Sequence, residues 1–152
     1  MTVMALPYSE MTLDQALIAF RKANALDAKY AGMDQTARSH FERHDMIHVL
    51  FGLDTSLRHE AQADGWTLMA SDISWTDIRA FMKLTEEQEL IAEIGPWAIA
   101  WGFVRAVPDY MAMAWRARRL HKKWPWSAND SYRERKVAEI RREFGINQAL
   151  GT

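Results

Sequence analysis

The stretch His44-Asp45-Met46-Ile47-His48, followed by Glu60 after eleven intervening residues, decides how this chain folds. Its two histidines are four residues apart, so on a helix they lie on one face, one turn from each other. Both imidazoles can then approach one cation, as in other helical motifs with this spacing. Asp45 lies about 100° around the helix from His44 and therefore borders the same face. The stretch predicts a helix that carries metal ligands.

Glu60 can join these histidines only if the chain turns back on itself. On one continuous helix the distance from His48 to Glu60 would be about 18 Å, which is too far for a shared cation. Gly52 suits the C-terminus of a helix, and Asp54 suits the N-cap of the next one. The sequence therefore predicts a helical hairpin centred near Leu53, with His48 and Glu60 at similar distances from the bend.

These side chains also limit the choice of metal. The predicted ligands are His44, Asp45, His48 and Glu60, which offer nitrogen and oxygen donors, and the chain has no cysteine. One divalent ion of zinc, iron, manganese or cobalt suits such donors, whereas calcium does not. If Asp45 lies beside the metal instead of on it, it is the best candidate for a catalytic general base. The simpler alternative is a chance pair of histidines on an exposed helix.

The composition indicates one all-α domain. A length of 152 residues is enough for one hydrophobic core, and a formal net charge of −1 gives no case for a nucleic-acid partner. The first residues have neither the basic region nor the apolar core of a signal peptide, which favours a cytoplasmic bacterial protein. No run favours a β-strand. We expect residues 1–152 to form a single-domain helical bundle of about six to eight helices, with the metal motif on a helical hairpin.

Signals for helix starts and stops place the individual elements. Thr12 and Gln15 form a capping box that opens a helix extending to about Ala28. The motif helix covers roughly residues 35–51. Further helices are predicted over residues 55–69, 74–82, 85–95, 96–106 and 109–121, and from Asp130 to Phe144, closed by Gly145.

Two segments outside the hairpin are candidates for contact with an apolar ligand or with lipid. Residues 94–104 (IGPWAIAWGFV) are continuously apolar but too few to cross a bilayer. They form either a buried core helix or the wall of an apolar site, where Trp97 and Trp101 would line one face. Residues 116–123 (RARRLHKK) are basic and are followed by two tryptophans, which suits either a solvated helix end or contact with anionic lipid headgroups.

The motif and its flanks resemble the Coq-four family of coenzyme Q (ubiquinone) biosynthesis proteins. The matching residues are His44, Asp45, His48, Gly52 and Glu60. A weaker similarity follows in residues 115–118 and 140–146, so that the resemblance covers roughly residues 40–147.

The resemblance implies an all-helical fold and a divalent metal held by His44, Asp45, His48 and Glu60. It also implies a polyprenylated aromatic quinone precursor as ligand and peripheral association with the inner membrane. The implied activity is oxidative decarboxylation at C1 of a 4-hydroxy-5-polyprenylbenzoate intermediate, in which a hydroxyl replaces the carboxylate. Trp97 and Trp101 would then hold the prenyl tail. We further expect a homo-oligomer or a member of a ubiquinone-biosynthesis complex.

Two other functions stay open from the sequence. One is a metal-dependent hydrolase, because histidine–aspartate doublets also occur in phosphohydrolases of the HD type. The other is a non-catalytic protein that binds a prenylated quinone precursor and organises a biosynthetic complex. Structural metal sites tend to be fully ligated and catalytic sites keep an open position, so four protein ligands are compatible with either role.

Overall fold

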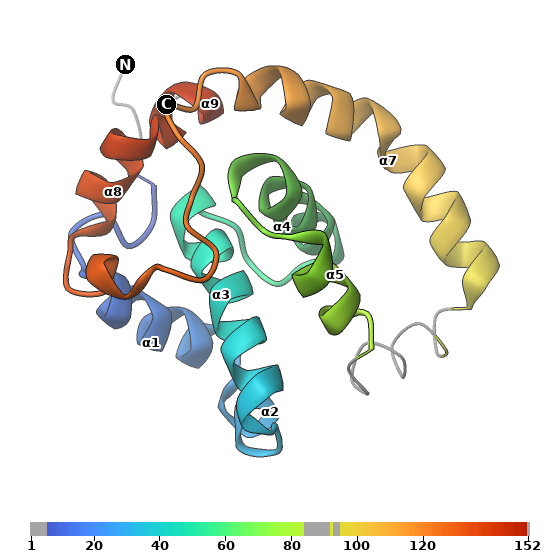
Figure 1. Ribbon diagram of the computed structural model, residues 1–152, viewed down its shortest axis with the longest axis horizontal. Helices are drawn as coiled ribbons and strands as arrows, with labels where there is room; N and C mark the ends of the chain where they lie inside the picture. The colour runs from blue at the N-terminus through green and yellow to red at the C-terminus, as the bar shows by residue number, and fades with distance from the viewer. Residues whose placement is uncertain (1–5, 84–91, 93–94, 152) are drawn as a thin grey trace.

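A computed structural model of the chain describes residues 6–83, 92 and 95–151, and this part is built from helices (Figure 1). No β-strand occurs among the described residues, where only isolated bridges pair Thr12 with Lys136 and Ser71 with Trp124. The predicted all-α class is confirmed. The elements are α1 (Leu13–Ala23), α2 (Asp27–Ala31), α3 (Gln35–Phe51), α4 (Leu57–Ala70), α5 (Trp75–Phe81), α7 (Pro96–Ala117), the 3-10 helix η1 (Asp130–Tyr132), α8 (Val137–Phe144) and α9 (Ile146–Leu150).

Helix α3 lies at the centre of the fold. It contacts α1, α4, α8 and α9, while α7 packs on α4 and arches along the outer side of the molecule (Figure 1). The main hydrophobic core fills the space around the C-terminal half of α3. The fully buried side chains at its centre include Phe20, Met46, Ile47, Leu50, Trp124, Ile140 and Phe144.

Local chemistry fixes both ends of α3, which has the bounds that the sequence predicts. The Asp34 side chain accepts a hydrogen bond from the Ala37 N–H at 2.8 Å and so caps the start of the helix. At the other end Gly52 has φ 70°, in the left-handed region that favours glycine. The Leu53 N–H then donates to the His48 carbonyl at 2.9 Å, and the chain turns toward α4.

The last carbonyls of α3 are held by a buried arginine from α8. The Arg141 guanidinium donates to the carbonyls of Leu50 at 2.8 Å and Val49 at 2.7 Å, and to Ser9 Oγ at 2.9 Å. Burial lowers the pKa of Arg141 to about 10, so that it remains charged at neutral pH. A cation at the C-terminal end of a helix is favourably placed against the helix dipole. This contact fixes α8 to the end of the motif helix.

The predicted hairpin is present, but its second helix begins later than expected. Helix α4 starts at Leu57 with Ser56 at the N-cap position, so the prediction of Asp54 as N-cap is wrong. The Asp54 carboxylate instead accepts from the Ser56 N–H at 2.8 Å and pairs with His59 at 2.8 Å. These local hydrogen bonds engage the Asp54 side chain within the turn, so α4 starts after this residue.

Two other predicted boundaries differ from the structure. The capping box of Thr12 and Gln15 is present, yet α1 ends at Ala23 and not near Ala28. Ala25 adopts φ 54°, and this left-handed residue separates α1 from α2. The helix predicted from Asp130 is a 3-10 turn, and α8 begins only at Val137 because the preceding residues bond to the start of α1. The helix predicted over residues 85–95 lies outside the described residues.

Helix α7 runs without a break through Pro108, where the sequence predicts two separate helices. Proline removes one backbone hydrogen bond, which frees the carbonyl of Val104 one turn earlier. Val104 and Pro108 are both exposed, so water can bind that carbonyl. Helices kink or bend at proline, and α7 is drawn as an arc in Figure 1. Among the described residues, no helix is both long enough and apolar enough to span a membrane.

The contact between α4 and α7 depends on a glycine in the middle of α4. A Cβ at Gly65 would lie 2.7 Å from Tyr110 Cε1 and 2.8 Å from Met113 Cε, so the absent side chain lets the two helices approach. The Tyr110 hydroxyl also donates to the Ala61 carbonyl at 3.2 Å. Gly65 therefore serves the close packing of α4 against α7.

We predict that Gly65→Ala destabilises the fold by about 1–2 kcal/mol, measured by urea unfolding. The overpacking cost of about 1–3 kcal/mol exceeds the gain of about 1 kcal/mol in helix propensity. Gly102→Ala is the matched control, because no atom lies within 4 Å of a Cβ at that position in α7. Stabilisation by both substitutions would contradict the close approach at Gly65.

Candidate metal centre

Three side chains gather between the two arms of the α3–α4 hairpin. One potential ligand atom from each of His44, His48 and Glu60 lies within 4.8 Å of the other two. The histidines come from successive turns of α3, and Glu60 comes from the first turn of α4. The hairpin therefore brings together three of the four predicted ligands, as the spacing requires.

The distances suit a shared cation. His48 Nε2 lies 3.4 Å from Glu60 Oε2. Two ligands of one metal, each bound at about 2.1 Å and separated by 90–109°, are roughly 3.0–3.5 Å apart. An ion can thus lie between His48 and Glu60, and a ligand atom of His44 is within 4.8 Å of both. Two imidazoles and one carboxylate fit zinc, iron, manganese or cobalt.

Packing fixes the orientation of both histidines. His48 is 1% exposed, its ring lies 5.3 Å from the Phe20 ring, and the rings of His44 and His48 meet edge to face at 4.9 Å. Within the described structure His48 Nδ1 is buried and has no hydrogen-bond partner. Burying an imidazole in this way costs free energy, which a metal bound at Nε2 would offset.

The carboxylates on α4 set the electrostatics of the site. Burial alone would lower the pKa of His44, but the hydrogen bond that His44 donates to Asp64 and the charges of Asp64 and Glu60 outweigh it, and the pKa is raised. Burial alone would raise the pKa of Glu60, but the contact with His48 and the charge of His44 lower it. Glu60 is thus held in its ionised form, which is the form that binds a cation.

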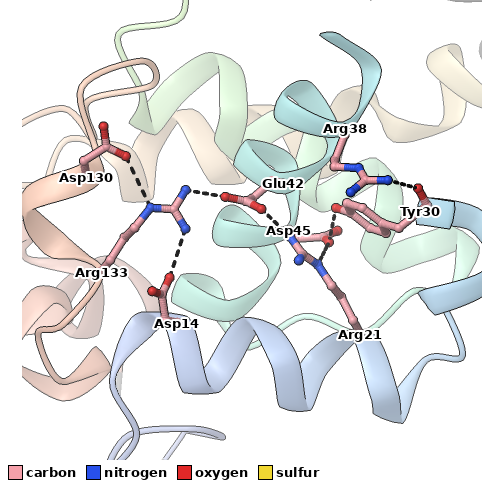
Figure 2. Close-up of polar contacts among 8 residues, drawn as sticks. All are labelled: Asp14, Arg21, Tyr30, Arg38, Glu42, Asp45, Asp130 and Arg133. Carbon is pink, nitrogen blue, oxygen red and sulfur yellow. Dashed lines mark hydrogen bonds and ion pairs between the residues drawn. The ribbon is translucent and has the colours of Figure 1, made fainter. Parts of the chain in front are cut away.

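Asp45 is not brought into this group, although it is one of the four predicted ligands. Its carboxylate is buried on another side of α3, where Oδ2 accepts from the Tyr30 hydroxyl at 2.5 Å and from Arg21 Nε at 3.2 Å (Figure 2). Burial raises the pKa of Asp45, against the opposing effect of the Tyr30 and Arg21 hydrogen bonds. In this arrangement Asp45 joins α3 to α1 and α2, and it occupies neither a ligand position nor that of a base beside the metal.

The network around Asp45 extends across the molecule (Figure 2). Arg21 also binds Glu42 at 3.0 Å, and Glu42 in turn pairs with Arg133 from the segment between η1 and α8. Arg133 Nη1 reaches Asp14 on α1 at 2.9 Å. These alternating charges tie α3 to α1 and to the C-terminal segment, on the side of the helix next to the one that carries His44 and His48.

The two predicted tail-binding residues lie on the outer surface of α7. Trp97 is 87% exposed and Trp101 is 63% exposed. The interpretation of this segment as a buried core helix is therefore wrong for these residues. Their exposure continues along α7 in a stripe of large apolar side chains, which comprises Trp97, Trp101, Val104, Val107, Met111 and Trp115.

The sequence analysis did not identify Asp64, which contacts the centre directly. Its Oδ1 lies 3.1 Å from His44 Nε2. The signal was present, because Asp64 follows Glu60 by four residues and so occupies the same face of α4 one turn later. Arg21 and Tyr30 were also missed, and nothing in their local sequence connects them with Asp45.

The chain matches no protein-family model, no curated protein and no solved structure. The resemblance to the Coq-four family therefore rests on the motif residues themselves.

We predict that Tyr30→Phe lowers the free energy of unfolding by about 1.5–3 kcal/mol, the usual contribution of a hydrogen bond to a charged group. Tyr132→Phe is the control, since the Tyr132 hydroxyl donates only a long hydrogen bond of 3.4 Å to Glu143. It should change stability by less than about 0.5 kcal/mol. Equal effects in urea unfolding would show that Tyr30 does not hold Asp45 as described.

Proposed function

We propose that this protein is a metal-dependent enzyme of coenzyme Q biosynthesis, which oxidatively decarboxylates a polyprenylated 4-hydroxybenzoate intermediate. The observation that carries the proposal is the group formed by His44, His48 and Glu60. On an octahedral ion these ligands leave open coordination positions for a substrate, as in two-histidine, one-carboxylate iron enzymes, and one further protein ligand would not close the site. The motif resemblance supplies the particular reaction.

The proposed reaction breaks the bond between C1 of the ring and its carboxyl carbon and forms a bond between C1 and a hydroxyl oxygen. Carbon dioxide leaves, and the ring loses two electrons overall. Dioxygen is the oxidant: with water as the source of the hydroxyl, it takes up the two electrons and two protons as hydrogen peroxide. When bound at the centre, the metal supplies a Lewis acid for the carboxylate and, if redox-active, a means of reacting with dioxygen.

The protein side chains provide binding and orientation. A cavity of about 300 Å³ lies between α3 and α5, and its lining includes His40, Arg43 and Asp77. This volume is at the lower end of the range of small-molecule sites and suits a single aromatic ring. His40, which lines this cavity, lies one turn before the proposed ligand His44 on α3. Arg43 offers a guanidinium to the ring carboxylate.

The outer face of α7 supports a lipid-linked substrate. Its apolar stripe of Trp97, Trp101, Val104, Val107, Met111 and Trp115 is exposed, and the exposed basic residues Arg105, Arg116, Arg118, Arg119, Lys122 and Lys123 lie beside or just beyond it. Tryptophan combined with basic residues suits the headgroup region of an anionic bilayer. A hydrolase of soluble phosphoesters would leave this surface without a role, so we prefer the prenyl-lipid substrate.

The reaction is tested with purified protein, each candidate metal and a short-chain prenylated 4-hydroxybenzoate labelled at the carboxyl carbon. We expect labelled carbon dioxide and the hydroxylated product in equal amounts, in the presence of dioxygen. His48→Ala should reduce both by at least about 100-fold, because it removes a metal ligand. His59→Ala is the control, since His59 pairs with Asp54 outside the centre. Metal uptake without turnover by any loaded form would contradict the proposed reaction.

The membrane surface is tested by partitioning into vesicles that contain anionic lipid. We predict that the double substitution of Trp97 and Trp101 by alanine weakens binding about tenfold or more, because two large apolar side chains no longer enter the interface. Trp75→Ala is a matched control, since Trp75 is 77% exposed but lies on α5. Equal loss in both proteins, or no binding by the wild type, would contradict the assignment of α7 as the lipid-facing surface.

A further inference from the structure

A second carboxylate faces the motif histidines from α4. Glu60 and Asp64 are four residues apart on α4, and His44 and His48 are four apart on α3. Because the two helices run in opposite directions, the residues pair crosswise: Glu60 lies opposite His48 at 3.4 Å, and Asp64 lies opposite His44 at 3.1 Å. The hairpin thus contains two histidine–carboxylate pairs, one turn apart.

We propose that Asp64 is a fourth ligand of the metal, which is then held by two imidazoles and two carboxylates. This inference rests on the proposed metal centre, but not on the decarboxylation. The motif places the second carboxylate at Asp45, whereas the geometry points to Asp64 in its place.

The contacts of the two aspartates distinguish them. Asp45 is buried and already binds Tyr30 and Arg21. The Asp64 side chain is 60% exposed. Its Oδ1 lies 3.1 Å from His44 Nε2, a distance that two ligands of one ion can have. Asp64 does not belong to the group of His44, His48 and Glu60, whose ligand atoms all lie within 4.8 Å of one another. Its side chain must therefore rotate toward the ion. An exposed side chain on a helix can do so at small cost.

The charge of a bound ion also favours Asp64 as a ligand. When His44 Nε2 binds a metal, it can no longer donate to Asp64, which then stands beside a dication without that hydrogen bond. A dication with two neutral imidazoles and Glu60 alone keeps one positive charge in a half-buried site. A second carboxylate makes the centre neutral, which lowers the cost of burying the ion. Ligation by Asp64 therefore replaces a lost contact and balances the charge.

The test is the affinity of the purified full-length protein for Zn²⁺, measured by competition with a chromophoric chelator. Asparagine at this position keeps the oxygen that accepts from His44 but is a poor metal ligand. We expect Asp64→Asn to weaken Zn²⁺ binding by at least about 10-fold to 100-fold. Asp54→Asn is the matched control, because Asp54 forms a similar exposed pair with His59 at 2.8 Å outside the centre, and it should leave the affinity unchanged.

Co²⁺ gives a second readout that a hydrogen-bonding role would not change. Replacement of a carboxylate by water in Asp64→Asn should alter the visible absorption of the bound Co²⁺, and Asp54→Asn should not. Unchanged Zn²⁺ affinity and an unchanged Co²⁺ spectrum in Asp64→Asn would overturn the assignment of Asp64 and leave the three-ligand centre intact. No metal binding by the wild type would overturn the centre itself, so the two failures can be told apart.

Discussion

The antiparallel register of α3 and α4 is the constraint on which the proposed centre depends. A shift of one residue in either helix would turn its ligand by about 100° and separate His48 from Glu60. The turn at Gly52 sets this register, and Arg141 fixes its position by binding the last carbonyls of α3. The ligands are thus placed by backbone geometry at the end of a helix and by a cation from a distant part of the chain.

Charged side chains hold the neighbouring side of α3. Arg21, Glu42, Asp45 and Arg133 link the helix to α1 and to the segment before α8 (Figure 2). Removing one partner of a buried charge pair costs far more than the pair itself contributes, so the network acts mainly to prevent movement. A helix fixed by these charge pairs can keep its two imidazoles in place. Preorganised ligands of this kind reduce the reorganisation needed to bind an ion.

Local signals in the sequence predicted the helices of the hairpin and three members of the site. The i, i+4 histidines, Gly52 and the spacing to Glu60 each act through neighbours in the chain, and each prediction agrees with the structure. Asp45 shows where this reasoning fails, because its direction is decided by Tyr30 and Arg21 on other helices. The continuous α7 through Pro108 was missed for a similar reason, since proline predicts a break but solvent around Val104 removes much of the penalty.

The metal centre is measured most directly by an anomalous-difference map from crystals grown with Zn²⁺ or Co²⁺. We expect one strong peak between α3 and α4, within about 2.0–2.2 Å of His44, His48 and Glu60. Asp45 should remain bound to Tyr30 and Arg21 in the same crystals. A peak coordinated by Asp45, a peak elsewhere on the surface, or no peak at millimolar metal would contradict it.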